Sequence, residues 1–210
     1  MKVTKYPQSC LLIEEEGRRL LIDPGSFVSK QFTANDLLPV DAILITHEHA
    51  DHLDSSLLKS LTAQGNIPVV GNASTAEAHA GVITKVVSDR DSFDVAGFHV
   101  TVRELPHCLM LDGSPGPQNS GYVIDGVFFH PGDGISIDDL RVENAAVPIA
   151  GPDVSPKDIY GFIRQLGCKA VVPIHYDYFP NDPKFVAQLL QSMNDDVKVV
   201  VLDNGQSTDI

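Results

Sequence analysis

The chain has 210 residues and a formal net charge of −13, because 28 Asp and Glu outnumber 15 Lys and Arg. That length is close to one domain of ordinary size, and a hydrophobic content of 43% is enough for a core, so we expect a single domain over residues 1–210. The negative charge disfavours binding to nucleic acid or to an anionic membrane. Small molecules are the expected partners.

Three widely spaced cysteines predict neither a disulfide framework nor a cysteine-based zinc site. The first residues lack the apolar segment typical of a signal peptide, and no apolar run approaches the roughly 20 residues needed to cross a bilayer. We therefore expect a cytoplasmic protein. The oligomeric state is left open.

The first half of the chain predicts a hairpin followed by alternating strands and helices. Apolar or alternating segments predict strands at 9–16, 18–22, 42–45 and 67–70. The break at Gly17 makes the first two strands an antiparallel pair. Leucines with helical spacing predict a helix over 53–61, and Ser74 with Glu77 forms a capping-box pattern that predicts the start of another.

The second half repeats this layout. Further strands are expected at 92–105, 121–129, 145–149, 170–174 and 197–202, with a loop at 112–117. Ser155 as N-cap and Pro156 as first residue predict a helix that stops at Gly167, and a last helix is expected to begin near 181–183. Two strand-rich halves that are each followed by helices predict an α/β fold. Its expected form is a four-layer αββα sandwich of two mixed sheets with helices on the outer faces.

Residues 46–52 carry the most informative motif, THEHADH, between a predicted strand and a predicted helix. His47, His49, His52 and Asp51 offer neutral imidazole and carboxylate, the ligands that a borderline divalent cation prefers. The alternative is a solvated histidine-rich loop. The position at a strand end favours a metal site.

With this loop, the chain resembles the metallo-β-lactamase superfamily. The resemblance is also carried by IDPG at 22–25, HPGD at 130–133 and PIH at 173–175, and it extends over nearly the whole chain. It is closest to the small single-domain branch that includes proteins like L-ascorbate-6-phosphate lactonase. The resemblance implies a metallo-β-lactamase fold with a first metal ion on His47, His49 and His107, a second on Asp51, His52 and His175, and Asp133 bridging the two.

Such a site would perform hydrolysis without a protein nucleophile. Two divalent ions about 3.5–4 Å apart can share a hydroxide whose parent water has its pKa lowered toward about 7. Asp51, Asp133 and His175 are accordingly the expected catalytic residues, with zinc or manganese as the expected metals. The site would be net positive, which favours a small anionic ester, lactone or phosphodiester.

Antibiotic hydrolysis is disfavoured, because Asp133 stands where β-lactamases with two zinc ions have Cys. The alternative function is a non-catalytic metal-binding sensor or partner-binding protein on the same fold. All seven ligand positions are present, whereas a protein that only binds metal, without catalysis, would tolerate the loss of one. The sequence therefore favours the enzyme.

For several residues close in sequence to the ligand positions, the sequence allows two roles. His130 either orients a ligand from the second shell or packs at a strand end. By the resemblance Asp23 supports the metal loop, although an Asp before Pro-Gly commonly caps its own turn. Asn119 and Tyr176 either bind substrate or pack in the core.

The apolar residues 109–111 either cover the metals as a hydrophobic lid or pack beneath their own loop. His79 and His99 have no metal-type neighbours in sequence, so we expect them to be structural or exposed.

Overall fold

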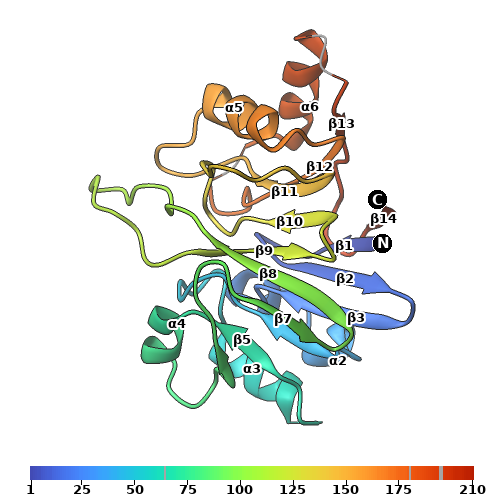
Figure 1. The fold of residues 1–210 in the computed structure, drawn as a ribbon, viewed down its shortest axis with the longest axis vertical. Helices are drawn as coiled ribbons and strands as arrows, with labels where there is room; N and C mark the ends of the chain where they lie inside the picture. The colour runs from blue at the N-terminus through green and yellow to red at the C-terminus, as the bar shows by residue number, and fades with distance from the viewer. Residues whose placement is uncertain (64, 180, 194–195) are drawn as a thin grey trace.

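The computed structural model describes residues 1–63, 65–179, 181–193 and 196–210. Two seven-stranded sheets pack face to face, and helices cover the outer face of each sheet, as Figure 1 shows. Both sheets contain parallel and antiparallel pairs. The expected four-layer fold with two mixed sheets is confirmed.

The first sheet has the strand order β14-β1-β2-β3-β4-β5-β6. Its strands are β1 (Lys2–Lys5), β2 (Leu11–Glu15), β3 (Arg18–Ile22), β4 (Ala42–Leu44), β5 (Val69–Gly71), β6 (Lys85–Val86) and β14 (Ser207–Asp209). Pairing is antiparallel from β14 to β3 and parallel from β3 to β6. The predicted hairpin is β2 and β3, with Leu12 opposite Leu21.

The second sheet has the order β13-β12-β11-β10-β9-β8-β7. Its strands are β7 (Ser92–Val95), β8 (Phe98–Glu104), β9 (Ser120–Ile124), β10 (Phe128–His130), β11 (Asn144–Pro148), β12 (Ala170–Ile174) and β13 (Lys198–Val199). Pairing is antiparallel from β7 to β10 and parallel from β10 to β13. Strands β8, β10 and β12 therefore run in the same direction and end at the same edge.

The described helices are short and amphipathic. They are α1 (Ser26–Ser29), α2 (Ala34–Leu37), α3 (Ser55–Thr62), α4 (Ala73–Ala78), α5 (Pro156–Leu166) and α6 (Pro183–Ser192). No described helix combines the length and apolar character that a bilayer crossing requires. Helix α5 is confirmed in detail, since Ser155 caps its start and Gly167 ends it in the left-handed conformation.

Several local predictions were wrong. The segments 92–105 and 121–129, each expected as a strand, are interrupted by turns, so that the first contains β7 and β8 and the second runs from β9 into β10. Helix α4 is capped by Asn72, whose side-chain oxygen accepts a hydrogen bond from the Thr75 amide, while the Ser74 hydroxyl donates to Glu48 instead. Asn and Ser are comparable N-caps, so the sequence did not distinguish them. The strand expected at 197–202 is limited to Lys198–Val199.

The largest apolar core lies between the two sheets. Leu11 and Ile13 of β2 face this inter-sheet core, whereas Leu12 faces the core beneath the helices of the first sheet. Both faces of β2 are thus buried, which explains why its apolar residues run consecutively rather than alternate.

A hydrogen bond through the inter-sheet core ties the sheets together next to the motif loop. The Tyr122 hydroxyl, fully buried on β9, donates to the Ile45 carbonyl at 2.7 Å. We expect Tyr122→Phe to lower the free energy of unfolding by about 1–3 kcal/mol, because a buried hydrogen bond is lost. Urea unfolding measures this, with Tyr178→Phe at an exposed ring as the control. Equal stability of the two variants would contradict the role of this bond.

Candidate metal centre

The seven predicted ligand residues meet where the strands of both sheets end. One group of potential ligand atoms, all within 4.8 Å of one another, comprises His47, His49, His107 and Asp133. A second group, defined in the same way, comprises Asp51, His52 and His175. The motif loop follows β4, and the other three residues follow β8, β10 and β12. Residues more than 120 positions apart in sequence thus share one site.

Asp133 lies between the two groups. Its Oδ1 is 3.0 Å from His52 Nε2, and its Oδ2 is 3.3 Å from His107 Nε2 and 3.0 Å from His175 Nε2. Each oxygen therefore faces imidazole nitrogens, and the carboxylate reaches members of both groups.

The donor atoms of the site suit a divalent cation. His52 Nε2, His107 Nε2 and Asp133 Oδ1 are buried and make no hydrogen bond within the described structure. Buried polar atoms are normally satisfied, and an unsatisfied one calls for an explanation such as an ion. Imidazole nitrogens and carboxylate oxygens converging on one region are the ligands that zinc and related metals prefer.

The remaining imidazole nitrogens are held by hydrogen bonds that orient the rings. In four histidines of the two ligand groups, Nδ1 forms a hydrogen bond to an oxygen. These bonds join His47 to Thr46 Oγ1 at 3.0 Å, His52 to Asp23 Oδ2 at 2.8 Å, His107 to the Cys108 carbonyl at 2.6 Å and His175 to the Ala150 carbonyl at 2.7 Å. A proton on Nδ1 leaves the Nε2 lone pair free for a metal. The network therefore selects the tautomer that binds.

Asp23 supports the motif loop. It is fully buried, and its carboxylate accepts hydrogen bonds from the Thr46 amide at 2.8 Å and the Thr46 hydroxyl at 2.7 Å, as well as from His52. Because Thr46 in turn accepts from His47, this one carboxylate orients a histidine of each group.

The charges inside the metal-free site are strongly coupled. Burial disfavours charge on His107 and His175, but their interactions with Asp133 outweigh it and raise the pKa of each imidazole to about 10. Burial also works against ionisation of Asp133, yet the positive charges of His175 and His52 hold its pKa well below the usual range. Burial lowers the pKa of His47. The carboxylate is thus ionised at neutral pH.

Gln8 contacts two of the potential ligand residues, and sequence analysis missed it. Its side-chain amide donates to Asp51 Oδ2 at 2.9 Å, and its backbone carbonyl accepts from the His175 amide at 3.1 Å. Asp177 fixes Gln8 in turn. Its carboxylate accepts from the Gln8 backbone amide at 2.6 Å, and its own backbone amide donates to Gln8 Oε1 at 3.1 Å. A lone Gln in a loop carries no sequence signal for this role.

Two glycines permit the close packing of the site. A Cβ on Gly25 would lie 1.9 Å from the carbonyl oxygen of Asp51, and one on Gly116 would lie 2.3 Å from His107 Nδ1. Both positions therefore exclude any side chain.

The other candidates lie around the site rather than in it. His130 donates from Nε2 to the Ser9 carbonyl, and its Nδ1 accepts from the Gly132 amide, so it holds the backbone before Asp133. The buried Asn119 accepts from the Asp133 amide at 3.3 Å and donates to the Pro131 carbonyl at 2.9 Å.

Three further residues bond away from the cluster. The Tyr176 hydroxyl donates to the Leu202 carbonyl at 3.2 Å. His79 contacts Ser55, and the exposed His99 contacts Asp94. Neither histidine belongs to a group of potential metal ligands.

A cavity of about 320 Å³ opens above the cluster. Its lining residues are His49, Ala50, Asp51, His107, Cys108, Leu109, Met110, Leu111, Asp133, Pro152, His175, Tyr178 and Phe179. Five of them belong to the ligand groups, so a molecule in the cavity would contact the centre directly.

Comparison with known proteins identifies the family of the chain. Residues 2–175 match the family described as a β-lactamase superfamily domain. Protein Rv0786c of Mycobacterium tuberculosis is 30% identical over 182 residues, covering 83% of this chain and 84% of that protein. A UPF0173 metal-dependent hydrolase of Xanthobacter autotrophicus is 30% identical over 241 residues, covering 100% of this chain and 98% of that protein.

A solved structure shows the same fold. Igni18, a metallo hydrolase from the archaeon Ignicoccus hospitalis, superimposes with a TM-score of 0.78 at 22% identity and covers 99% of this chain and 97% of its own. The chain therefore belongs to the β-lactamase superfamily. Within that superfamily it is a metal-dependent hydrolase, related to the UPF0173 proteins.

The contact of Gln8 with Asp51 is testable. We expect Gln8→Ala to weaken binding of the more weakly held ion about tenfold or more, because loss of an outer hydrogen bond to a ligand typically costs that much in metal affinity. Titration of the metal-free protein with zinc in competition with a chelator measures this. Gln165→Ala, which removes an exposed amide, is the control. Affinities equal to wild type in both variants would show that Gln8 does not position Asp51.

Proposed function

We propose that the protein uses two divalent metal ions, zinc or manganese, to hydrolyse a small ester, lactone or phosphodiester. The observation that carries this proposal is the pair of ligand groups joined by Asp133 at the base of a cavity. The structure and the relatives support a metal-dependent hydrolase. The number of ions, their identity and the class of bond are our inference.

The two groups of potential ligands would each hold one metal ion. In this proposal His47, His49 and His107 would hold one ion, and Asp51, His52 and His175 would hold the other. Asp133, whose carboxylate reaches members of both groups, would be available to both ions. When bound, two such ions supply a hydroxide at neutral pH and stabilise the negative charge of the transition state. Asp51, Asp133 and His175 line the cavity, where they face the bond that is cleaved.

The overall charge supports a small substrate over a polymer. At −13 the chain repels a nucleic acid backbone and an anionic membrane surface. We therefore propose a small-molecule substrate in the cytoplasm, without nucleic acid or membrane partners. An anionic group of the substrate would bind at the ions, the positive part of the site.

Metal content tests the assignment of ligands. We expect about two ions per chain in the wild type after incubation with zinc and desalting. Asp133→Ala should reduce the occupancy of both sites, because its carboxylate reaches both groups, whereas His49→Ala should mainly empty one. His79→Ala is the control and should retain about two ions per chain. Inductively coupled plasma mass spectrometry measures the ratio, and wild-type content in all variants would refute the assignment.

Turnover tests the enzyme itself. We expect protein loaded with manganese or zinc to hydrolyse bis-p-nitrophenyl phosphate or a simple lactone above the buffer rate. Removal of the metal with a chelator should abolish the rate, and readdition should restore it, because no protein nucleophile is needed. A protein that binds two ions but hydrolyses neither class of bond would instead be a non-catalytic metal sensor.

A further inference from the structure

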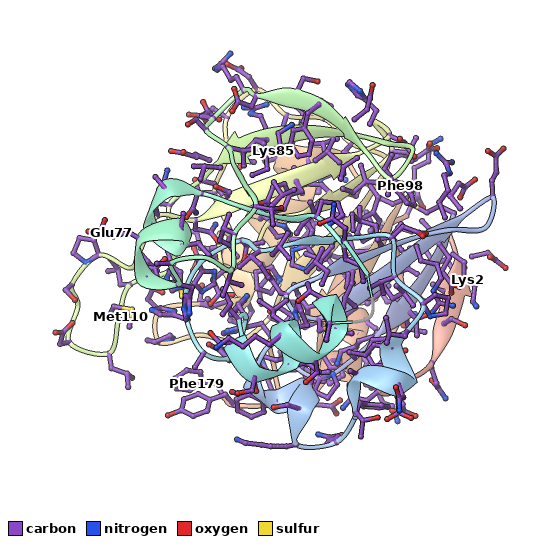
Figure 2. The ribbon with its side chains drawn as sticks, turned by 90° about the horizontal axis from the view of Figure 1, so that it is seen from below. Lys2, Glu77, Lys85, Phe98, Met110 and Phe179 are labelled. Atoms are coloured by element: carbon purple, nitrogen blue, oxygen red, sulfur yellow. The ribbon has the colours of Figure 1, made fainter. Side chains whose placement is uncertain are left out.

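The cavity above the metal centre has a polar base and an apolar wall. The wall consists of residues 109–111, from the loop between β8 and β9, together with Pro152, Tyr178 and Phe179. That loop projects beyond the edges of both sheets at the left of Figure 1. Met110 and Phe179 lie toward the same side of the molecule in Figure 2. Two distant segments thus form a single apolar wall.

Much of this wall is exposed. Leu109 is 43% exposed, Leu111 76% and Tyr178 59%. Leu111 therefore does not pack beneath its own loop. Large apolar side chains gathered at the mouth of a cavity, rather than scattered singly, mark a ligand-binding surface.

Hydrogen bonds and ring contacts fix the wall in place. The Leu109 amide donates to Asp153 Oδ1 at 3.1 Å, and the Met110 amide donates to the Ser114 carbonyl at 2.9 Å. The Tyr178 ring packs edge to face on Phe179, with centroids 4.7 Å apart, and on Phe27 of α1 at 6.1 Å. The exposed apolar surface is therefore a preformed feature of the site.

The distribution of charge limits what this wall can bind. All titratable histidines and carboxylates that line the cavity belong to the two ligand groups, and none of its described lining residues is Lys or Arg. A charged group at the far end of a substrate would lose hydration without gaining a partner. Among the described lining residues, the groups that can compensate a charge therefore lie at the end of the cavity formed by the two ligand groups.

Resting on the proposed function, we propose that the substrate is an ester or lactone that carries a short alkyl chain or an aromatic ring. Its scissile group lies at the metal centre, and its apolar group lies between residues 109–111 and the pair Tyr178 and Phe179. The cavity of about 320 Å³ has room for about ten non-hydrogen atoms, taking the roughly 30 Å³ that a water molecule occupies in the liquid. Substrates of that size are small metabolites.

Binding of straight-chain carboxylates tests this directly, with a readout that does not need turnover. Calorimetry with zinc-loaded protein should show affinity rising about two- to fourfold for each methylene from butanoate to octanoate, because each buried methylene adds about fourfold at most. Octanedioate, with a second charge at the far end, should bind at least tenfold more weakly than octanoate. Affinity that is independent of chain length would overturn the proposal, as would a second copy of the chain covering the wall.

Matched variants locate the effect. Met110→Gln should reduce the rise in affinity for each added methylene. Met193→Gln is the control and should leave that rise unchanged, because Met193 is an exposed methionine at the end of α6 that does not line the cavity. An equal rise in affinity per methylene in both variants would show that the apolar wall does not contact the alkyl chain.

The outcomes separate this inference from the hydrolase itself. Hydrolysis of short esters with no effect of chain length on binding would overturn the apolar site and leave the enzyme. Binding that strengthens with chain length, without hydrolysis of any ester, would support the apolar site and contradict the enzyme.

Discussion

The geometry of the centre depends on one buried carboxylate, that of Asp23. A polar group removed from water must be hydrogen-bonded, and the Asp23 carboxyl oxygens are satisfied by the amide and hydroxyl of Thr46 and by Nδ1 of His52. Each of these bonds fixes part of the motif loop. Because Thr46 also contacts His47, rotation of either imidazole would leave a buried polar atom without a partner. The loop is therefore held in one conformation before any ion binds.

Contacts with the second sheet complete this support. The carbonyl of Thr46 accepts from the Ser120 amide and from the Asn72 side chain, each at 3.0 Å. Asn119, next to Ser120, holds the backbone of Asp133. The motif loop of the first sheet and Asp133 of the second are thus positioned by two consecutive residues at the start of β9, Asn119 and Ser120, which brings the two groups of potential ligands together.

The site combines two environments that serve different parts of a reaction. At the base, carboxylates and imidazoles offer the oxygen and nitrogen donors that a divalent ion prefers. On one side, exposed leucines and aromatic rings offer apolar surface without a charged partner. Selectivity in such a cavity comes from loops rather than from the ligand set, because loops vary without disturbing the strands that carry the ligands. The loop that carries Met110 is the clearest example here.

The sequence by itself determined those elements that depend on residues close to one another along the chain. Apolar runs and turn residues predicted most strands of both sheets, and the cap of α5 followed from Ser155. The spacing of the motif placed four potential ligand residues, three His and one Asp, on one loop. Strands β1, β6 and β14 were not predicted, because each is short and carries polar side chains, and because their pairing rests on backbone hydrogen bonds to strands distant in sequence. The contact of Gln8 with Asp51 and the apolar wall of the cavity were decided only by the tertiary structure. Both features bring together residues that are distant in sequence, and such contacts cannot be predicted from a local pattern of side chains.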